Sequence, residues 1–549
     1  MLFNTIEFFI FLGIVYALYR CLPCRAQNRM LLAASYLFYG CWDLRFLFLI
    51  VISTAVDFCA GLLIDSGEIN RRKRWLVSTY VLVSAFCFVT IEWNAVEILD
   101  NSLRIEWPNL LSSGMGWAVF AGTLVIVLIG NLLYPFLISL DRTQRRHIAL
   151  FISVITNLGI LGFFKYFNFF LFSAGDLLQL FGLSVDSLRL NIILPVGISF
   201  YTFQTMSYTI DIYRGKMQAT DQFLDFALFV SYFPQLVAGP IERAVHLLPS
   251  LLEPRKRNFK QTAHGLHLIL IGLFKKVAIA DGVAQTVDQV YGSTGVVTGT
   301  DVVIATCLFA IQIYCDFSGY SDIARGVSNL LGIDLVVNFR TPYFSSSPQE
   351  FWRRWHISLS NWLRDYLYIP LGGSRQSPIK TYRNLMMTMT LGGLWHGAAW
   401  NFVLWGIYQG AILGGYRVWV SWRGKQRNNF EFSNFIPIGQ ATSIIFCLIF
   451  VLYGWLLFRA QSLSQIVDFT GKILTIHSVD FGADIPRFSA IVGIPVLVVL
   501  DTLEYSHKND ENYYHYLPRF MRGALYALMT FSLVLGVTNP PAEFIYFDF

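Results

Sequence analysis

Full charges are scarce in this 549-residue sequence. Asp, Glu, Lys and Arg together make up 14% of the residues, whereas they make up about a quarter of an ordinary soluble domain. Residues 107–140 and 432–458 contain none of these four residue types, and each stretch exceeds the roughly 20 apolar residues that cross a bilayer as a helix. The mean hydropathy is +0.52. The composition excludes an ordinary soluble protein and predicts an all-α, polytopic membrane protein.

Signals of several other architectures are also missing. The eight cysteines are scattered, and Cys21 and Cys24 form a lone CxxC, so we expect neither a disulfide framework nor a metal site there. His264 and His267 lie one helical turn apart, but zinc needs three or four ligands. We therefore expect no metal. The apolar stretch Leu2–Tyr19 contains an acidic residue and has no basic segment before it, which favours a retained span over a cleaved signal.

Basic residues alternate along the first third of the chain. The segments 20–29, 71–74 and 142–146 are rich in Lys and Arg, whereas 42–45 holds one arginine and 92–106 holds four acids and one arginine. Because cytoplasmic loops carry the excess of Lys and Arg, this pattern predicts an N-terminus outside the cytoplasm. The chain would then be a multi-pass membrane protein with its N-terminus on the outer side.

We expect a single membrane domain with three parts: N-terminal helices over 1–173, a central core over 192–422, and C-terminal helices with an aromatic tail over 440–549. The core begins irregularly, because "LPVGISFYTFQ" and "SYFPQLVAGPIER" place Pro and Gly inside apolar runs. Broken backbone at membrane depth is tolerated only inside protein or beside water. These segments should line an interior, although interfacial loops are an alternative.

The most informative stretch is "SSSPQEFWRRWHISLSNWLRDYLYIPLGG". Ser347 as N-cap, Pro348 and Glu350 predict a helix start, and Pro370 with the following glycines predicts its end. Apolar residues repeat at three- and four-residue steps, with most polar residues opposite. The pattern predicts one amphipathic helix along the membrane interface. His356 falls at the border of its two faces, where a histidine is most often a bland boundary residue.

His396 stands in "LGGLWHGAAWNFVLWG", which contains no full charge. An ionisable group inside a membrane bundle is costly, so its default interpretation is functional. Desolvation would keep the imidazole neutral, which suits a general base. Gly392, Gly393 and Gly397 would leave room for a substrate chain or a neighbouring backbone. A purely structural hydrogen bond between helices is the alternative.

These blocks also carry a resemblance. "FWRRWHISLSNWLRDYLYIPLGG", "LGGLWHGAAWNFVLWG", "PVGISFYTFQ" and "SYFPQLVAGPIER" resemble, in order, the signature blocks of the membrane-bound O-acyltransferase (MBOAT) family. The most similar branch is the alginate O-acetyltransferase type, which acylates exported bacterial polysaccharides. The resemblance covers about residues 194–410. It implies a bundle of about 11–13 transmembrane helices, with re-entrant and interfacial helices, around a central tunnel.

By this resemblance, His396 is the buried catalytic histidine and His356 occupies the second key position. We expect His396 to act as general base and His356 to orient or bind the donor, with exchanged roles as an alternative. Polar and aromatic residues near the two histidines are the candidates for contacts with substrate or donor. They are Trp352, Arg353, Arg354, Trp355, Asn361, Arg364, Asp365, Trp395 and Asn401.

The chain ends in "FIYFDF". An aromatic anchor at the membrane interface is one interpretation. In the other, Tyr546 reaches into the outer mouth of the tunnel and accepts the acyl group as a covalent relay, while Phe544 and Phe547 dock the tail. A similar aromatic tail accompanies this branch of the family.

The resemblance implies no tightly bound cofactor. The donor would be a cytosolic thioester, acetyl-coenzyme A or an acyl carrier protein, and the acyl group would be small, acetyl by analogy. An outer-side acyltransferase that finishes the transfer to the polysaccharide is the expected partner, with membrane lipid around the protein and no nucleic acid. The alternatives are a secondary transporter or a noncatalytic scaffold for polysaccharide export, but no internal repeat supports a transporter.

Overall fold

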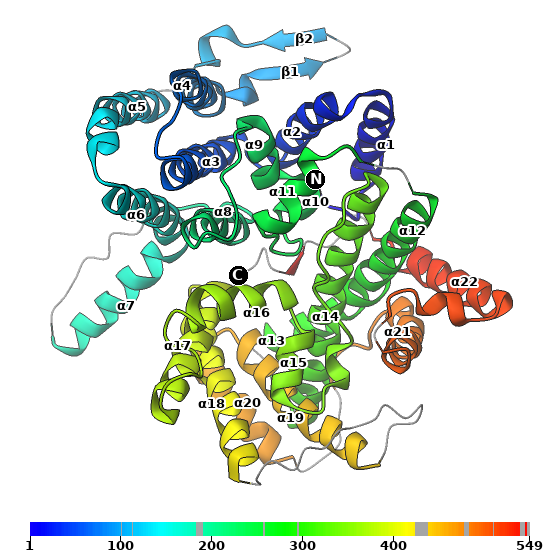
Figure 1. Ribbon diagram of the computed structural model, residues 1–549. Coiled ribbons are helices and arrows are strands. Elements are labelled where there is room, and N and C mark those ends of the chain that lie inside the picture. Colours follow the sequence, from blue (N-terminus) through cyan, green and yellow to red (C-terminus); the bar gives the residue numbers. More distant parts are fainter. Residues whose placement is uncertain are drawn as a thin grey trace. The chain divides into compact units, whose positions relative to one another are not determined.

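The computed structural model describes residues 1–99, 102–111, 114–182, 190–255, 258–293, 296–422, 438–476, 482–508, 510–538 and 544–545. The chain forms two compact units. The N-terminal unit comprises residues 7–237 and 241–256, and the C-terminal unit comprises residues 2–6, 238–240 and 257–549. Both units consist almost entirely of helices (Figure 1).

The N-terminal unit contains eleven α-helices and two strands among its described residues: α1 (Ile6–Cys21), α2 (Cys24–Gly40), α3 (Leu44–Asp65), α4 (Arg71–Ala85), β1 (Val96–Leu99), β2 (Ser102–Ile105), α5 (Met115–Ser139), α6 (Arg142–Leu161), α7 (Phe167–Leu180), α8 (Ile198–Tyr213), α9 (Phe223–Ser231), α10 (Phe233–Leu236) and α11 (Ala244–Leu252). The strands pair antiparallel, with Val96 opposite Ile105. This short hairpin leaves the predicted all-α class unchanged. The second strand, SLRI, alternates polar and apolar residues at the period of a strand, whereas the first, VEIL, ends in two apolar residues.

Polar contacts join three helices inside the N-terminal unit. Asp57 of α3 is fully buried, and it accepts hydrogen bonds from the Ser153 hydroxyl (2.5 Å) and the Asn157 amide (2.8 Å) of α6. Ser153 also contacts the hydroxyl of Thr209 on α8 at 2.9 Å. Such side-chain bonds satisfy polar atoms where no water is available. They therefore fix α3, α6 and α8 against one another.

The two broken segments of the sequence are buried. Residues 198–209 and 226–237 all lie in the interior, as the broken pattern predicts. Helix α8 begins after Gly197, which has φ 73°. A Cβ atom there would lie 2.6 Å from the carbonyl oxygen of Leu236, so glycine is required both by the conformation and by the close approach.

The C-terminal unit contains these helical elements: α12 (Phe259–Leu273), the π-helical segment η5 (Phe274–Ala280), α13 (Asp281–Tyr291), α14 (Gly299–Leu330), α15 (Pro348–Arg354), α16 (Ile357–Leu363), the π-helical segment η7 (Arg364–Tyr368), α17 (Pro378–His396), α18 (Trp400–Trp422), α19 (Ile438–Arg459), α20 (Leu463–Leu474), α21 (Phe488–Ser506) and α22 (Arg519–Gly536). The long helix α14 starts with a capping box formed by Thr298 and Asp301. Most of its side chains are buried, so it forms the centre of this unit.

Six helical stretches are long and apolar enough to cross a membrane among the described residues. They are Leu44–Asp65, Met115–Ser139, Arg142–Leu180, Gly299–Leu330, Gly439–Arg459 and Phe488–Ser506. The protein is therefore a multi-pass, helical membrane protein. The larger number of about 11–13 crossings stays a prediction, because α17, with 19 residues, is long enough to cross but is more polar than these six stretches.

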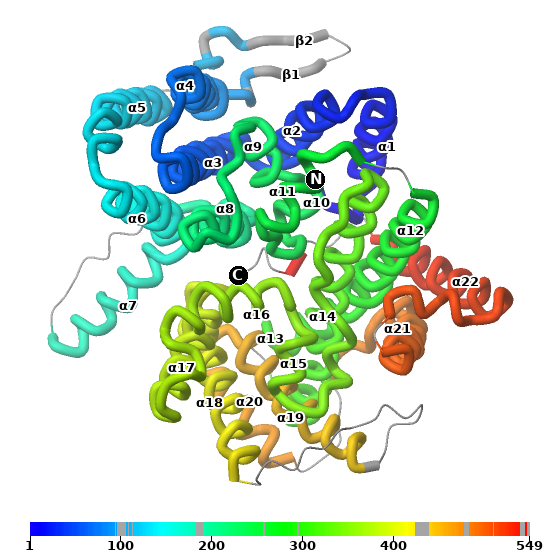
Figure 2. Tube along the Cα trace, in the orientation of Figure 1, coloured from blue at the N-terminus to red at the C-terminus, as the bar shows by residue number. Residues whose placement is uncertain are grey.

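Helices α17 and α18 form a close hairpin, which can be followed along the trace in Figure 2. A Cβ atom on Gly393 would lie 2.2 Å from the carbonyl oxygen of Phe402 and 2.9 Å from the Cα of Gly406. A Cβ on Gly397 would meet the Phe402 ring at 2.1 Å. The sequence left two roles open for these glycines, room for a substrate chain or room for a neighbouring backbone. Gly393 and Gly397 have the second role, because they allow the two helices of the hairpin to pack closely. The hairpin fixes the end of α17, where His396 lies.

We predict that Gly393→Ala destabilises the C-terminal unit. The added methyl group overlaps the backbone of α18, and overpacking of this kind costs about 1–3 kcal/mol. The thermal unfolding midpoint of the detergent-purified protein should fall by several degrees. Gly415→Ala, at a position of α18 where a Cβ atom meets nothing within 4 Å, is the matched control. Equal midpoints for the two variants would contradict the packing argument.

Candidate active site

The helix that carries the first histidine is broken in two. The start is as predicted, because the Ser347 hydroxyl accepts the Glu350 backbone N–H at 3.2 Å. However, α15 ends at Arg354, Trp355 is extended, and His356 takes a left-handed conformation with φ 41° before α16 begins. The expected continuous amphipathic helix is therefore wrong. His356 is fully buried at the break, and it does not lie on the border of two helix faces.

Asn338 holds the break in place. Its backbone carbonyl accepts the Ile357 N–H at 2.9 Å, and its side-chain oxygen accepts the Ser358 N–H at 3.3 Å and the Ser358 hydroxyl at 2.9 Å. The Asn338 amide nitrogen donates to the hydroxyl of Ser321 on α14 at 3.3 Å. One side chain thus connects α14 to both sides of the helix break.

The same amide selects the tautomer of His356. The Nδ1 atom of His356 lies 3.1 Å from Asn338 Oδ1. Because the backbone N–H of Ser358 can only donate, the atom that it contacts must be the amide oxygen, and His356 Nδ1 must therefore carry the hydrogen. The neutral ring then has its lone pair on Nε2. Nε2 of His356 can accept a proton or a hydrogen bond from a ligand.

Burial keeps His356 neutral. Loss of solvent lowers the pKa of this imidazole to about 3, because the charged form is disfavoured in a nonpolar environment. The rings of Phe317 and Phe339 form two of its walls, with centroid distances of 4.6 and 6.4 Å. A neutral imidazole at physiological pH is the state that a general base or a hydrogen-bond acceptor needs.

His396 lies in an aromatic box at the end of α17. It is 4% exposed, and its ring contacts those of Trp395 (4.9 Å), Trp405 of α18 (5.2 Å) and Phe458 of α19 (5.4 Å). All three contacts are edge-to-face. Three helices therefore build a tight, nonpolar enclosure around this imidazole.

The indole of Trp395 lies between the environments of the two histidines. Its ring centroid is 4.9 Å from that of His396 and 6.0 Å from that of His356. Two histidines 40 positions apart in sequence therefore pack against one buried side chain. The structure brings together the two residues that the sequence singles out.

Several other candidates have structural partners. Arg354 pairs with Glu350 at 2.8 Å and donates to the Arg340 carbonyl at 3.2 Å, and the Asn401 amide donates to the Phe458 and Ala460 carbonyls at the end of α19. These contacts stabilise helix ends.

The remaining candidates divide between surface and interior. Arg353 is exposed and Asn361 is half-buried, while Arg364 forms an ion pair with its neighbour Asp365. Trp352 contacts the Trp405 ring at 5.8 Å, and Trp355 is buried against Trp455 at 4.7 Å. The two tryptophans therefore belong to the aromatic cluster that surrounds the histidines.

The tail returns to the interior of the C-terminal unit. Phe544 is 1% exposed and contacts the rings of Tyr320 (4.9 Å) and Phe317 (5.9 Å) on α14. The next residue, Ile545, donates its backbone N–H to Asp316 Oδ2 at 2.8 Å. The Phe317 ring contacts both Phe544 and His356, so it connects Phe544 to the histidine. Tyr546 and Phe547 lie outside the described residues.

A helical membrane bundle that encloses two histidines, with Phe544 and Ile545 buried near one of them, is consistent with a membrane-embedded transferase. The sequence profile of the membrane-bound O-acyltransferase family matches residues 213–459. The chain is 34% identical over 466 residues to a probable alginate O-acetylase of Azotobacter vinelandii, covering 84% of this chain and 76% of that protein. It is 35% identical over 417 residues to the peptidoglycan O-acetyltransferase of Helicobacter pylori, covering 69% and 76%.

A more distant relative is the teichoic acid D-alanyltransferase of Bacillus subtilis, which is 26% identical over 293 residues, 49% of this chain and 70% of that protein. The chain belongs to the membrane-bound O-acyltransferase family. It is an O-acyltransferase of the membrane.

Sequence reasoning missed two residues of the site, Asn338 and Ser358. Asn338 stands in the apolar run "LVVNF", where a polar amide is unusual and signals a buried hydrogen bond. Ser358 carries no such signal on an amphipathic pattern. Asp316 and Ser321 interrupt the apolar pattern of α14 in the same way as Asn338 does, and both have partners at the site.

We predict that Asn338→Leu lowers kcat/KM for acyl transfer about tenfold, the cost of losing one buried hydrogen bond to a reacting group. Asn338→Asp tests positioning separately. A carboxylate next to Nδ1 raises the pKa of His356, so the rate of acyl transfer by this variant should fall as the pH is lowered. The parent should show no loss from His356 protonation above about pH 5, since the pKa of His356 is about 3.

Ser360→Ala serves as the control, because its hydroxyl contacts only the Trp355 carbonyl among the hydrogen bonds found. Rates of acyl transfer, measured in membrane vesicles across pH 5–8, distinguish a lost hydrogen bond in Asn338→Leu from a shifted pH dependence in Asn338→Asp. Parent-like rates in Asn338→Leu together with an unchanged pH profile in Asn338→Asp would remove Asn338 from the mechanism.

Proposed function

We propose that this protein transfers an acetyl group from a cytosolic thioester toward a polysaccharide on the outer side of the membrane, with chemistry at His396 and His356. The observation that carries the proposal is the packing of both buried imidazoles against Trp395. The relatives support the acceptor class, because their names specify alginate O-acetylation and peptidoglycan O-acetylation. Acetyl-coenzyme A and an acetylated carrier protein both have the required thioester.

In the proposed reaction, His396 acts as general base. The acceptor hydroxyl gives its proton to the imidazole while its oxygen attacks the thioester carbonyl carbon. The carbon–sulfur bond then breaks, and the imidazolium returns the proton to the leaving thiolate. The aromatic box of Trp395, Trp405 and Phe458 supports this role, because a nonpolar enclosure excludes water that would hydrolyse the acyl group.

His356 has the complementary role. With Nδ1–H donated to Asn338, its Nε2 accepts a hydrogen bond and can orient an N–H group of the thioester donor. The same tautomer also suits the exchanged assignment, in which His356 takes the proton and His396 positions the donor. A fixed orienting partner on the far nitrogen is a feature of general bases, so this observation favours the exchange as the second candidate.

We predict that His396→Ala folds, inserts into the membrane and loses transfer. Removing a general base lowers kcat by about 100-fold or more, whereas removing a donor-binding group raises the KM for the donor. Release of free thiol from acetyl-coenzyme A in membrane vesicles measures both constants. His356→Ala should raise the donor KM.

His515→Ala, at an exposed histidine of the same unit, is the control for histidine loss. The opposite pattern, in which the kcat effect belongs to His356→Ala, would establish the exchanged roles. Near-normal kcat and KM in both variants would refute the histidine mechanism altogether.

We also propose that the chain's tail takes part in the transfer. Burial of Phe544 and the hydrogen bond from Ile545 to Asp316 support docking of the tail beside α14. Tyr546, the next residue, would accept the acetyl group on its hydroxyl as a phenyl ester and pass it to an outer-side acyltransferase. This partner, the bacterial inner membrane and a periplasmic N-terminus belong to the same proposal.

We predict an added mass of one acetyl group, about 42 Da, on the C-terminal peptide after incubation with acetyl-coenzyme A. Tyr546→Phe keeps the aromatic ring and removes the hydroxyl, so the modified peptide should disappear. Peptide mass spectrometry of rapidly quenched protein gives the measurement. An unmodified tail in the parent during turnover would rule out the relay and leave direct transfer.

Phe544→Ala tests docking without touching the acceptor hydroxyl. Loss of a buried aromatic contact should lower the modified fraction while Tyr546 is present. Tyr516→Phe, which changes an exposed tyrosine, is the control and should leave the modified fraction unchanged.

A further inference from the structure

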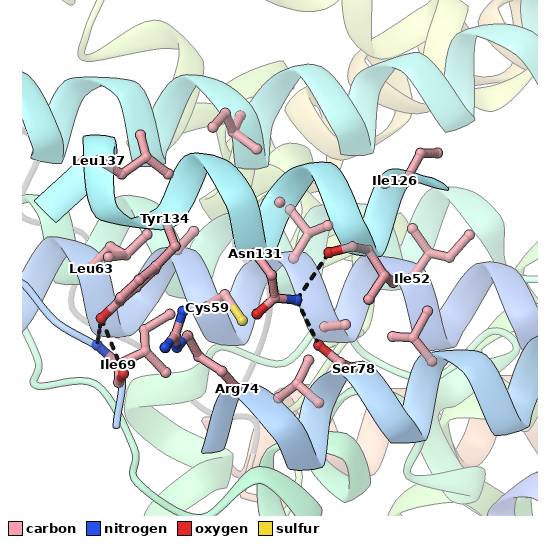
Figure 3. Close-up of a pocket in the computed structure, with 18 of the residues that line it drawn as sticks. Ile52, Cys59, Leu63, Ile69, Arg74, Ser78, Ile126, Asn131, Tyr134 and Leu137 are labelled. Atoms are coloured by element: carbon pink, nitrogen blue, oxygen red, sulfur yellow. Dashed lines mark hydrogen bonds between the residues drawn. The ribbon is translucent and has the colours of Figure 1, made fainter. Parts of the chain in front are cut away.

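A groove opens in the N-terminal unit between α3, α4, α5 and α6. It has a volume of about 310 Å³, which is in the range of small-molecule sites. Apolar side chains line most of it, among them Ile52, Val56, Leu63, Val77, Ile126 and Ile152. Figure 3 shows Arg74 and Ser78 from α4 and Asn131 and Tyr134 from α5 pointing into it.

The arginine in this groove is held in a fixed orientation. The guanidinium carbon of Arg74 lies 3.9 Å from the centroid of the Tyr134 ring. Tyr134 is itself fixed, because its hydroxyl accepts the Ile69 N–H at 2.7 Å and donates to the Ile69 carbonyl at 3.0 Å (Figure 3). A stacked guanidinium presents its N–H edge sideways, as in arginines that bind phosphate.

The edge of this guanidinium is not satisfied within the protein. The Nε atom of Arg74 is buried and has no hydrogen-bond partner among the residues that the structure describes. A buried donor without a partner is costly. An anionic hydrogen-bond acceptor in the groove would satisfy both the positive charge of Arg74 and its unpaired Nε–H.

The location of the groove identifies the kind of ligand. Only Gly116, Thr123 and Tyr134 are buried among the residues of α5, so the rest of this apolar helix faces the hydrocarbon of the bilayer. Arg71, Arg72 and Lys73 precede Arg74, and α6 begins with three more arginines within its first five residues. Basic clusters at the end of a span attract anionic lipid headgroups.

We propose that this groove binds an anionic phospholipid, with one acyl chain along the apolar walls and the headgroup phosphate against Arg74. The proposal is independent of the acyl-transfer chemistry, because every residue involved belongs to the N-terminal unit. The Ser78 hydroxyl and the Asn131 amide, 3.1 Å apart, also line the groove and would lie beside the acyl chain of the lipid.

Two variants separate the headgroup from the chain. Arg74→Gln removes the charge and keeps a side chain of similar length. Gly130→Leu fills the groove, since Gly130 lines it and a Cβ atom there meets nothing within 4 Å. The matched controls are Arg25→Gln, at an exposed arginine of α2 outside this basic cluster, and Gly122→Leu on α5, where a Cβ atom also meets nothing within 4 Å.

The test uses the purified full-length protein and native mass spectrometry, with dioleoyl phosphatidylglycerol or dioleoyl phosphatidylcholine as added lipid. The parent should bind phosphatidylglycerol about tenfold more tightly, because the choline group of phosphatidylcholine offsets the phosphate charge that pairs with Arg74. Arg74→Gln should lose this preference, and Gly130→Leu should weaken binding of both lipids. Arg25→Gln and Gly122→Leu should behave as the parent does.

A kept preference in Arg74→Gln, or binding to Gly130→Leu equal to that of Gly122→Leu, would overturn the proposal. Gel filtration verifies that each variant is folded, and Gly130→Leu carries the test if Arg74→Gln does not fold. Glycerol 3-phosphate, which has the phosphate without the chains, should not displace the lipid. Displacement by it at equal concentration would assign the site to a free phosphate and would also overturn the proposal.

Discussion

The side chain of Asn338 constrains the point at which α15 ends and α16 begins, and the position of His356 depends on it. A non-glycine residue at φ 41° costs on the order of 1–3 kcal/mol, and each short helix leaves backbone groups to satisfy. Asn338 accepts the Ile357 N–H through its backbone and the Ser358 N–H through its side chain. Because the same side chain accepts from His356 Nδ1, the support of a strained backbone and the choice of tautomer are one interaction.

Local chemistry made part of this region predictable. The Ser347 cap follows from residues within one helical turn, and it is observed. The break nine residues later was not predictable by the same reasoning, because Trp355 and His356 are neither glycine nor proline. The groups that stabilise the break come from a different segment, since Arg354 bonds to the Arg340 carbonyl and His356 to Asn338. Interactions of this range override the amphipathic period.

The position of His396 within an apolar stretch marked it for function, but the sequence does not name the walls of its enclosure. Two of them, Trp405 and Phe458, come from α18 and α19. The close crossing of Gly393 and Phe402 sets the turn between α17 and α18, and the Asn401 amide caps the end of α19 beside Phe458. Residues expected near a substrate therefore build the enclosure, and packing and chemistry share the same side chains.

Phe544 and Ile545 pack against α14 beside His356. Asp316 accepts the Ile545 N–H and also pairs with Lys276 at 2.8 Å. Lys276 contacts Asp281 as well, at 3.0 Å, so two carboxylates share this buried cation. Phe317, the neighbour of Asp316, contacts His356 and Phe544. In the proposed relay, the accepting tyrosine directly follows Ile545 in the sequence. A tethered group loses little further freedom on reaction, which is the advantage of an intramolecular acceptor over a diffusing one.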